Sequence, residues 1–325
     1  MAISRKRRAT LGAIAAAMAI LALPAAAQQS AIRMVLGYPA GATSDILSRL
    51  LAEHMRQSLG QPVIVENKPG AGGRIGNEVV KAAAPDGGTL LMTPVATMAI
   101  FPHSFAGTLR YDPLRDFAPV AHLSNFHLGL GVAAGVPARS LAEYVALVKK
   151  DPKAGYYASA AAGSLPHFLG VMFARTAGIE LTHVPYKGTA HAMQAIAGGE
   201  ISAISTVAAD IGTLVKGGKA RLLATSGPER SSAFPDVPTF RESGYDMEAV
   251  PWYALFAPAG TPQPRIERLA RAAIDAVRDP AIRQKLERMG LEPTGLGPPE
   301  LGAILKADYD KWGPVIRASG FKPGQ

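Results

Sequence analysis

Three segments of small and hydroxylated residues are the parts of the chain best suited to binding a small anion. They are the first segment (residues 39–45), the second segment (159–167) and the third segment (186–189), and each follows an apolar run and precedes residues with helical spacing. Small side chains let a ligand approach the backbone, and the first N–H groups and the dipole of a helix favour negative charge. If the three segments faced one cleft, they could hold a carboxylate without an arginine. Each segment could equally do no more than turn the chain and cap its helix.

Patterns for metal binding and for nucleophilic catalysis are weak. The chain has no cysteine, which excludes thiolate metal sites, iron–sulfur clusters, a thiol nucleophile, disulfides and a lipoprotein anchor. Its seven histidines include no H-E-x-x-H pair, and the chain has no G-x-S-x-G nucleophile motif. An S-x-x-K pattern, from Ser319 to Lys322, falls in the last seven residues, where we expect no preorganised site. We therefore expect no catalytic residue, no metal and no cofactor.

Two glycine-rich stretches need separate interpretation. Residues 129–134 match the loose dinucleotide pattern G-x-G-x-x-A, and Asp151 lies at a suitable distance beyond them. The following helix is expected to begin only at Ser140, so these glycines fall in or just after a strand and not at a helix start, as nucleotide binding requires. The glycines of residues 70–76 miss that spacing, and we interpret this stretch as a turn that lets a helix pack closely.

The net charge depends strongly on the N-terminus. The chain carries 34 Lys and Arg against 25 Asp and Glu, a net charge of +9 that could suggest a nucleic-acid partner. Basic residues 5–8, the 13-residue apolar run 11–23 and the Ala-x-Ala end at Ala27 together are typical of a secretory signal peptide. The run is too short to span about 30 Å of hydrocarbon. Cleavage after Ala27 removes four basic residues and no acidic one, which leaves +5, so we expect no nucleic-acid partner.

Length and periodicity predict two α/β domains. At about 100–200 residues per domain, 325 residues that are 48% hydrophobic suffice for two ordinary cores. Apolar runs at 32–38, 63–66 and 89–93 alternate with residues of helical spacing, a pattern that predicts parallel βαβ units. A second set of strands is expected at residues 128–133, 156–159, 181–186, 201–206 and 221–225.

Local signals predict where several elements begin and end. We expect a helix over residues 46–59 that ends at Gly60, a residue suited to a left-handed C-cap. Thr261 and Asp279 each precede a proline, the order found when an N-cap residue precedes proline at the first helical position. The apolar stretch 249–258 would cross back to the first domain, and the C-terminal helices would pack there.

A series of motifs along the chain stands in the order found in one known family. They are Tyr38-Pro39-Ala40-Gly41 with Ser44-Asp45, residues 65–73, 84–87, 111–113 and 116–120, Gly163-Ser164 with His167, residues 184–188 and 234–239, Trp252, and residues 257–262. Together they resemble the solute-binding receptors of tripartite tricarboxylate transporters, the Bug-type proteins. The resemblance spans nearly the whole chain after the signal peptide.

This resemblance implies an architecture. The expected fold is a two-lobed, type II-like periplasmic-binding-protein fold in which each lobe is a mostly parallel sheet flanked by helices and the ligand lies in a cleft between the lobes. Residues 1–27 would be the signal peptide, 28–130 with 251–325 the first lobe, and 131–250 the second. The lobes would close on a small carboxylate that is held largely by backbone, hydroxyls and water.

The resemblance also implies which residues bind the ligand. Tyr38, just before the first segment, would cover the ligand. Within the segment Gly41, Ser44 and Asp45 would shape a carboxylate pocket, and Ala40 would also be a binding residue. The second would contribute Ser159, Ala160, Gly163, Ser164 and His167. The third would contribute Tyr186, Lys187, Gly188 and Thr189, and Thr206 would join them from a neighbouring strand.

Four positions depart from the family pattern. Ala42 and Ala161 stand where the family usually has glycine, His191 where it has proline, and Thr206 where it often has aspartate. Alanine restricts the backbone more than glycine does. The lost acid and the added histidine could change which ligand fits, so the identity of the carboxylate stays open.

The function implied is that of a periplasmic receptor. We expect it to be a monomer that captures a small carboxylate and delivers it to the membrane permease of a tripartite tricarboxylate transporter. One alternative is a component that senses a ligand and signals to a membrane kinase. A less favoured alternative is a secreted hydrolase or lyase that uses the same cleft.

Overall fold

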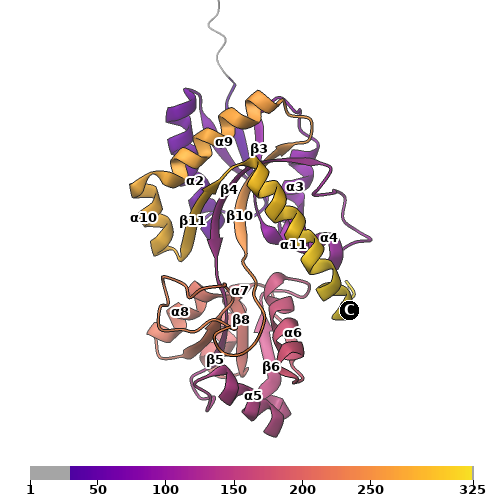
Figure 1. Ribbon diagram of the computed structural model, residues 1–325, viewed down its shortest axis with the longest axis vertical. Coiled ribbons are helices and arrows are strands. Elements are labelled where there is room, and N and C mark those ends of the chain that lie inside the picture. Colours follow the sequence, from indigo (N-terminus) through magenta and orange to yellow (C-terminus); the bar gives the residue numbers. More distant parts are fainter. Residues whose placement is uncertain (1–29, 324–325) are drawn as a thin grey trace, which may run out of the picture.

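The protein consists of two lobes, each a β-sheet flanked by helices (Figure 1). The computed structural model describes residues 30–323, so the expected signal peptide lies outside the described residues. The expected two-lobed α/β fold is confirmed. Within residues 30–323, none of the helices combines the length and the apolar character that crossing a bilayer requires.

The first lobe contains a six-stranded sheet in the order β11-β4-β10-β3-β1-β2. Its strands are β1 (Ile32–Leu36), β2 (Val63–Asn67), β3 (Thr89–Pro94), β4 (Phe117–Phe126), β10 (Trp252–Pro258) and β11 (Leu291–Leu296). Strands β2, β1 and β3 are parallel, whereas β10, β4 and β11 pair antiparallel. Every residue of β3 is buried, so the core of this lobe surrounds the middle of the sheet.

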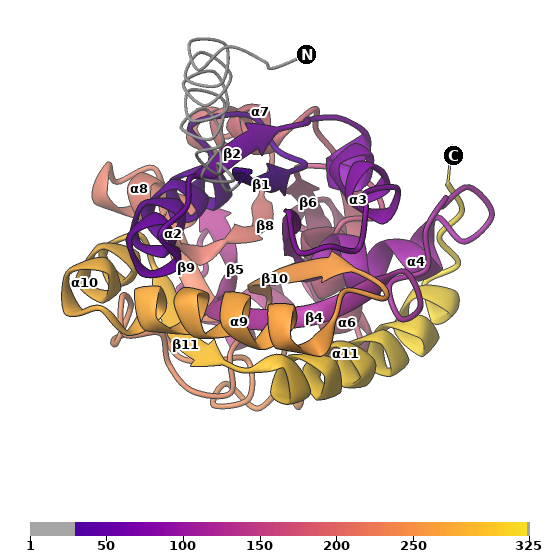
Figure 2. The same ribbon diagram turned by 90° about the horizontal axis from the view of Figure 1, so that it is seen from above.

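Helices cover both faces of the first sheet. They are α2 (Thr43–Leu59), α3 (Arg74–Lys81), α4 (Phe101–Ser104), α9 (Gln263–Arg278), α10 (Pro280–Arg288) and α11 (Pro298–Ala318), with a short 3₁₀ turn (Ala71–Gly73) and a π-helical turn (Ala96–Ile100). Helices α2 and α9 lie side by side on one face, and α3 and α11 cover the other (Figure 2). Leu47, Leu51 and Met55 repeat at helical spacing and bury the inner face of α2 completely.

The second lobe contains a five-stranded sheet in the order β7-β6-β8-β5-β9. Its strands are β5 (Leu128–Ala133), β6 (Tyr156–Ser159), β7 (Thr182–Pro185), β8 (Ala203–Val207) and β9 (Ala220–Thr225). Its helices are α5 (Leu141–Lys150), α6 (Leu165–Ala177), α7 (Thr189–Gly198) and α8 (Ala208–Lys216), with a 3₁₀ turn (Pro152–Gly155). Strands β7, β6 and β8 are parallel, and β5 runs antiparallel to β8 and β9.

Both sheets are therefore mixed rather than mostly parallel. The reason lies in the strands next to the crossings between lobes: β5 is antiparallel to both of its neighbours, and so is β10. The parallel βαβ expectation holds for β2-β1-β3 and for β7-β6-β8. These parallel sets carry all three small-residue segments.

The chain crosses between the sheets twice, and the two crossings are hydrogen-bonded to each other. His127 alone separates β4 from β5, and residues 226–251 separate β9 from β10. The Phe126 N–H donates to the Pro251 carbonyl (2.9 Å), and the Ser226 N–H donates to the Leu128 carbonyl (2.9 Å). The two lobes are thus joined by a paired connection.

Local signals are mostly confirmed, with two differences. Gly60 has φ +66° and ends α2, and the Asp279 carboxylate accepts the N–H groups of Ala281 (2.9 Å) and Ile282 (3.0 Å) at the start of α10. The expected cap at Thr261 is wrong, because its hydroxyl donates to the Pro258 carbonyl and α9 begins only at Gln263.

Helix α2 begins earlier than expected, at Thr43. The N–H groups of Asp45 and Ile46 donate to the Ala42 carbonyl at 2.9 and 3.0 Å, and Ala42 itself is extended. The first segment is therefore shorter as a loop than the sequence indicated. Its last three residues form the first turn of the helix.

Candidate functional site

In each lobe the parallel strands end at one edge of the sheet. In the second lobe, Ser159 of β6 stands opposite Pro185 of β7, and Ala158 stands opposite Ile204 of β8. The chain therefore leaves β6, β7 and β8 side by side. In open α/β sheets this carboxyl edge is where ligands bind.

The second and third segments are joined directly. The Tyr186 N–H donates to the Ser159 carbonyl (2.9 Å), and the Gly188 N–H donates to the Ala160 carbonyl (3.0 Å). Gly188 has φ +103°, a conformation that suits glycine, and Thr189 then opens α7. The structure thus brings these two predicted segments together, and Lys187 of the third segment is exposed.

Hydrogen bonds within the second segment fix its shape. Ser164 caps α6: its hydroxyl accepts the His167 N–H (3.4 Å) and donates to the Ala161 carbonyl (2.7 Å). The Gly163 N–H donates to Nδ1 of His167 (3.1 Å). Ser159 is fully buried, and its hydroxyl lies 3.1 Å from the Ala161 carbonyl.

Two stacked histidine rings pack against the second segment. The rings of His167 and His183 stack with centroids 4.0 Å apart, and Nε2 of His183 lies 2.7 Å from the Ser159 hydroxyl. Burial lowers the pKa of His167 to about 4 and that of His183 to about 3, where the neighbouring His167 adds to the effect. Both rings are therefore neutral at neutral pH. Because Nδ1 of His167 accepts a bond, its proton is on Nε2.

In the first segment, Asp45 organises the loop. Its carboxylate accepts the Gly41 N–H (2.9 Å), two bonds from Arg49 (3.0 Å each) and one from Asn67 (2.9 Å). Burial alone would raise the pKa of Asp45, but the bonds from Arg49, Gly41 and Asn67 together lower it. Asp45 and Ser44 are buried, whereas Ala40 and Gly41 are exposed, so Asp45 shapes the loop from within.

Tyr38 joins the first segment to the glycine-rich turn after β2. Its hydroxyl donates to the Gly72 carbonyl (3.0 Å), and the Asn67 side chain donates to the Tyr38 carbonyl (3.0 Å). Burial and the neighbouring Tyr253 raise the pKa of Tyr38 far above its ordinary value. The helix that follows the turn packs closely, as expected: a Cβ at Gly76 of α3 would lie 2.8 Å from the Gly37 backbone.

Two residues near this site were missed by the sequence analysis. Asp210, in the first turn of α8, has a pKa that burial raises and that the neighbouring Thr206 partly lowers. Burial, and after it the charge of Asp210, raises the pKa of Tyr253 of β10, and Tyr253 in turn adds to the effect of burial on the pKa of Tyr38. Thr206 and Asp210 are four residues apart, which could have indicated their contact. The position of Tyr253 relative to Asp210 depends on how the two lobes are placed, so no sequence signal could have indicated it.

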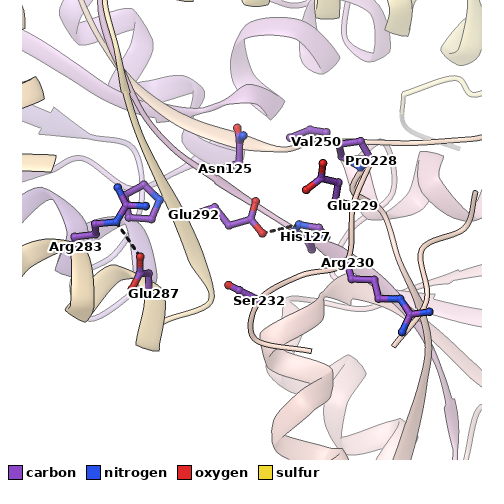
Figure 3. A pocket seen from close by; sticks show the side chains of 11 residues that line it. Asn125, His127, Pro228, Glu229, Arg230, Ser232, Val250, Arg283, Glu287 and Glu292 are labelled. Carbon is purple, nitrogen blue, oxygen red and sulfur yellow. Dashed lines mark hydrogen bonds and ion pairs between the residues drawn. The ribbon is translucent and has the colours of Figure 1, made fainter. Parts of the chain in front are cut away.

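A cavity of about 390 Å³ lies elsewhere, beside the crossings (Figure 3). It is lined by Asn125, His127, Pro228, Glu229, Arg230, Ser232, Val250, Arg283, Glu287, Glu292 and Pro293, and so by no residue of the three segments. Nε2 of His127 lies 2.8 Å from Glu292, and Arg283 pairs with Glu287 at 3.0 Å. Several of its charged side chains are thus already paired with one another. Over residues 30–323, no group of three His, Cys, Asp or Glu side chains is arranged to hold a metal ion.

The glycines of residues 129–134 serve packing. Gly129 and Gly131 lie inside β5, where a Cβ at Gly131 would lie 2.8 Å from the Ile211 side chain of α8. A Cβ at Gly129 would lie 2.5 Å from Leu222. The absence of side chains lets α8 and β9 approach the strand, which accounts for the dinucleotide-like spacing.

Comparison with known proteins gives consistent relatives. The UPF0065 protein in gbd 5'region of Cupriavidus necator is 36% identical over 286 residues, 86% of each chain. Protein BugT of Bordetella pertussis is 32% identical over 298 residues, 90% of each chain. Similar solved structures include MatC from Rhodopseudomonas palustris with bound malate, with 29% identity and a TM-score of 0.75 over 88% of this chain and 98% of that one.

Two further comparisons agree. An R. palustris protein with adipate has 27% identity and a TM-score of 0.81, over 90% of this chain and 98% of that one. The sequence profile of the tripartite tricarboxylate transporter family receptors matches residues 47–321, most of the chain. The protein therefore belongs to the tripartite tricarboxylate transporter receptor family, the Bug-type solute-binding proteins.

Proposed function

We propose that this receptor captures a small mono- or dicarboxylate between its lobes in the periplasm and delivers it to the permease of a tripartite tricarboxylate transporter. The observation that carries the proposal is the direct bonding of the second and third segments, through Tyr186 to Ser159 and Gly188 to Ala160, at the carboxyl edge of the second sheet. Related structures with malate and adipate support a carboxylate ligand. Membership of the family supports a permease partner.

The proposed site holds its ligand mainly with backbone and neutral groups. Helices α2, α6 and α7 each begin in one of the three segments, and their first N–H groups and dipoles favour an anion. Lys187 is exposed at the third segment and supplies a positive charge. The binding residues in this proposal are Tyr38, Ala40, Gly41, Ser44, Asp45, Ser159, Ala160, Gly163, Ser164, His167, Tyr186, Lys187, Gly188, Thr189 and Thr206.

Capture would proceed by closure of one lobe on the other. We take each sheet with its helices as one lobe, and the paired crossings at His127 and 226–251 as the hinge. Residues 1–27 would direct export and be removed. Since the permease must distinguish loaded from empty receptor, we expect it to recognise the closed form.

Thermal denaturation of the mature protein, residues 28–325, with a panel of carboxylates tests the proposal. A ligand at 100 times its Kd should stabilise the fold by about 2.7 kcal/mol. Mass spectrometry of the mixture should then recover the ligand unchanged. Conversion of the ligand to a product would support the hydrolase or lyase alternative, and no stabilisation by any carboxylate would refute the ligand class.

Two variants locate the site. Lys187→Ala should weaken binding of the stabilising carboxylate because it removes the exposed cation of the third segment. Ser44→Ala, in the first segment, should also weaken binding of that carboxylate. Lys216→Ala, an exposed lysine at the far end of α8, is the matched control. Unchanged affinity in both site variants would contradict the assignment of the site.

A further inference from the structure

The end of the chain carries one aromatic ring, Phe321, into contact with both lobes. Its ring centroid lies 6.3 Å from Phe105, which directly follows α4 in the first lobe. It also lies 5.6 Å from His167 and 5.7 Å from Phe168, both on α6 of the second lobe. All three contacts are edge-to-face, a favoured geometry for aromatic pairs.

The C-terminal turn of α11 fixes the position of this ring. Helix α11 runs from the first lobe toward α6 of the second (Figure 1). Ser319 ends the helix, and Gly320 follows in the left-handed region at φ +68°. The Phe321 N–H then donates to the Ser319 hydroxyl (3.1 Å). Phe321 is therefore held by the turn, although it lies near the end of the chain.

Phe321 lies directly against the backbone of the second segment. A Cβ at Gly163 would come within 2.7 Å of the Phe321 ring and 3.5 Å of the Phe105 ring. Gly163 also has φ +74° and donates its N–H to His167, which itself touches Phe321. The ring thus covers the segment at the point where its backbone turns.

In the first lobe, Phe105 is linked through Arg74 to Tyr38, which directly precedes the first segment. The Arg74 guanidinium lies 4.2 Å from the centroid of the Phe105 ring, a cation–π contact. Nε of Arg74 donates to the Ala71 carbonyl (2.7 Å), and the next carbonyl, that of Gly72, accepts the Tyr38 hydroxyl. Contacts therefore run without a break from Tyr38 in the first lobe to Gly163 in the second.

We propose that Phe321 is a positioning residue for ligand capture: together with Phe105 it fixes the second segment relative to Tyr38. Phe321 acts through Gly163 and His167 and is not itself among the proposed binding residues. The expected consequence of this positioning is tighter ligand binding, and this part of the inference rests on the proposed function. Its structural content, an ordered second segment, can be measured without any ligand.

Hydrogen exchange of the ligand-free protein tests the structural content. Phe321→Ala should speed exchange in the peptide covering residues 159–168 at least tenfold, because the Gly163 N–H loses its cover. Exchange in residues 263–278, which form α9, should stay unchanged. Lys322→Ala, which alters the exposed neighbouring residue of the same tail, is the matched control and should behave as the wild type does. Unchanged exchange in Phe321→Ala would overturn the inference.

Calorimetry and stopped-flow binding with malate, succinate and adipate test the consequence. For whichever of these ligands the wild type binds, Phe321→Ala should raise the Kd about tenfold, which corresponds to 1.4 kcal/mol. Most of this change should come from faster dissociation. Phe321→Leu should restore most of the affinity, because it refills the space against Gly163. Equal affinity of Phe321→Ala and wild type would overturn the inference. If the wild type bound no carboxylate, the proposed function would fail, and the exchange experiment would still decide the role of Phe321.

Discussion

At the scale of single residues, the site contains two acids in different surroundings: Asp45, whose charge is balanced by neighbouring hydrogen-bond donors, and Asp210, whose pKa shift has no cation among its causes. Asp45 is surrounded by Arg49, Asn67 and the Gly41 N–H, so its charge is used within the first segment. Asp210 is only partly buried, and the side chain that offsets the rise of its pKa on burial is the neutral Thr206. An anionic ligand near Thr206 would therefore experience the charge of Asp210 and not that of Asp45.

Replacement of Asp210 by asparagine should strengthen the binding of a plain dicarboxylate. Two like charges about 4 Å apart in a water-like medium repel by about 1 kcal/mol, which corresponds to roughly a fivefold change in affinity. Calorimetry at pH 7.5 with succinate measures this. Asp246→Asn, which changes an acid of the crossing 226–251 that is almost fully exposed, should leave affinity unchanged.

The same residue should make binding depend on pH. Because burial raises the pKa of Asp210, lowering the pH from neutral should neutralise this residue before Asp45 and Asp116, whose pKa values are lowered, and so improve dicarboxylate binding. The ligand's own titration affects wild type and Asp210→Asn alike, so the difference between the two proteins isolates the residue. Weaker binding by Asp210→Asn would contradict repulsion, and would indicate that Asp210 accepts a hydrogen bond from the ligand.

At the scale of elements, the sequence predicted what local signals determine. The strand over 156–159 and the N-cap of α10 at Asp279 follow from apolar runs, caps and prolines, and the structure confirms them. Strands β4 and β11 were not predicted. Residues such as His122 and Ser124 are polar yet buried in β4, and Nδ1 of His122 finds its partner 2.7 Å away in Thr294 of β11. No local pattern indicates a partner so distant in sequence.

Part of the proposed binding site could likewise be predicted from local sequence signals, and part could not. The three segments could be identified because strand, small-residue loop and helix start are consecutive in sequence. The influence of Asp210 on Tyr253, and the approach of Phe321 to Gly163, join elements that are far apart in sequence. They depend on the placement of two lobes and a C-terminal helix, which spacing alone does not determine.

The cap of α10 allows a test of an element away from the three segments. Asp279→Ala removes the acceptor of two backbone N–H groups and should cost about 1 kcal/mol of unfolding free energy. The melting temperature should fall by about 2 °C. Carboxylate affinity should not change, because α10 packs on α9 and β11. Asp275→Ala, an exposed aspartate of α9, should leave the melting temperature nearly unchanged, and an equal loss there would contradict a capping role.

At the scale of the whole molecule, buried neutral histidines in both lobes make the fold sensitive to acid. Burial lowers the pKa of His122 in the first lobe to about 4, that of His167 in the second to about 4, and that of His183 to about 3. In the unfolded chain a histidine has a pKa of about 6.5. Near pH 5, in the window between these pKa values, the unfolded chain therefore binds about three protons that the folded chain excludes.

Stability should consequently fall as the pH decreases through this window. Each excess proton on the unfolded chain contributes a slope of about 1.4 kcal/mol per pH unit. Asp45, Glu66 and Asp116, whose pKa values are lowered in the fold, lose their stabilising contribution only at lower pH, near and below 4 to 4.5. Urea unfolding at pH 7, 6 and 5 should thus report the histidines, with Asp210 and Asp308, whose pKa values burial raises, contributing in the opposite direction. His183→Gln should reduce the slope by about one proton, whereas His191→Gln, at an exposed histidine, should not. A wild-type unfolding free energy that stayed constant from pH 7 to pH 5 would show that these rings are not held neutral, and the ordered second segment that depends on His167 and His183 would have to be explained differently.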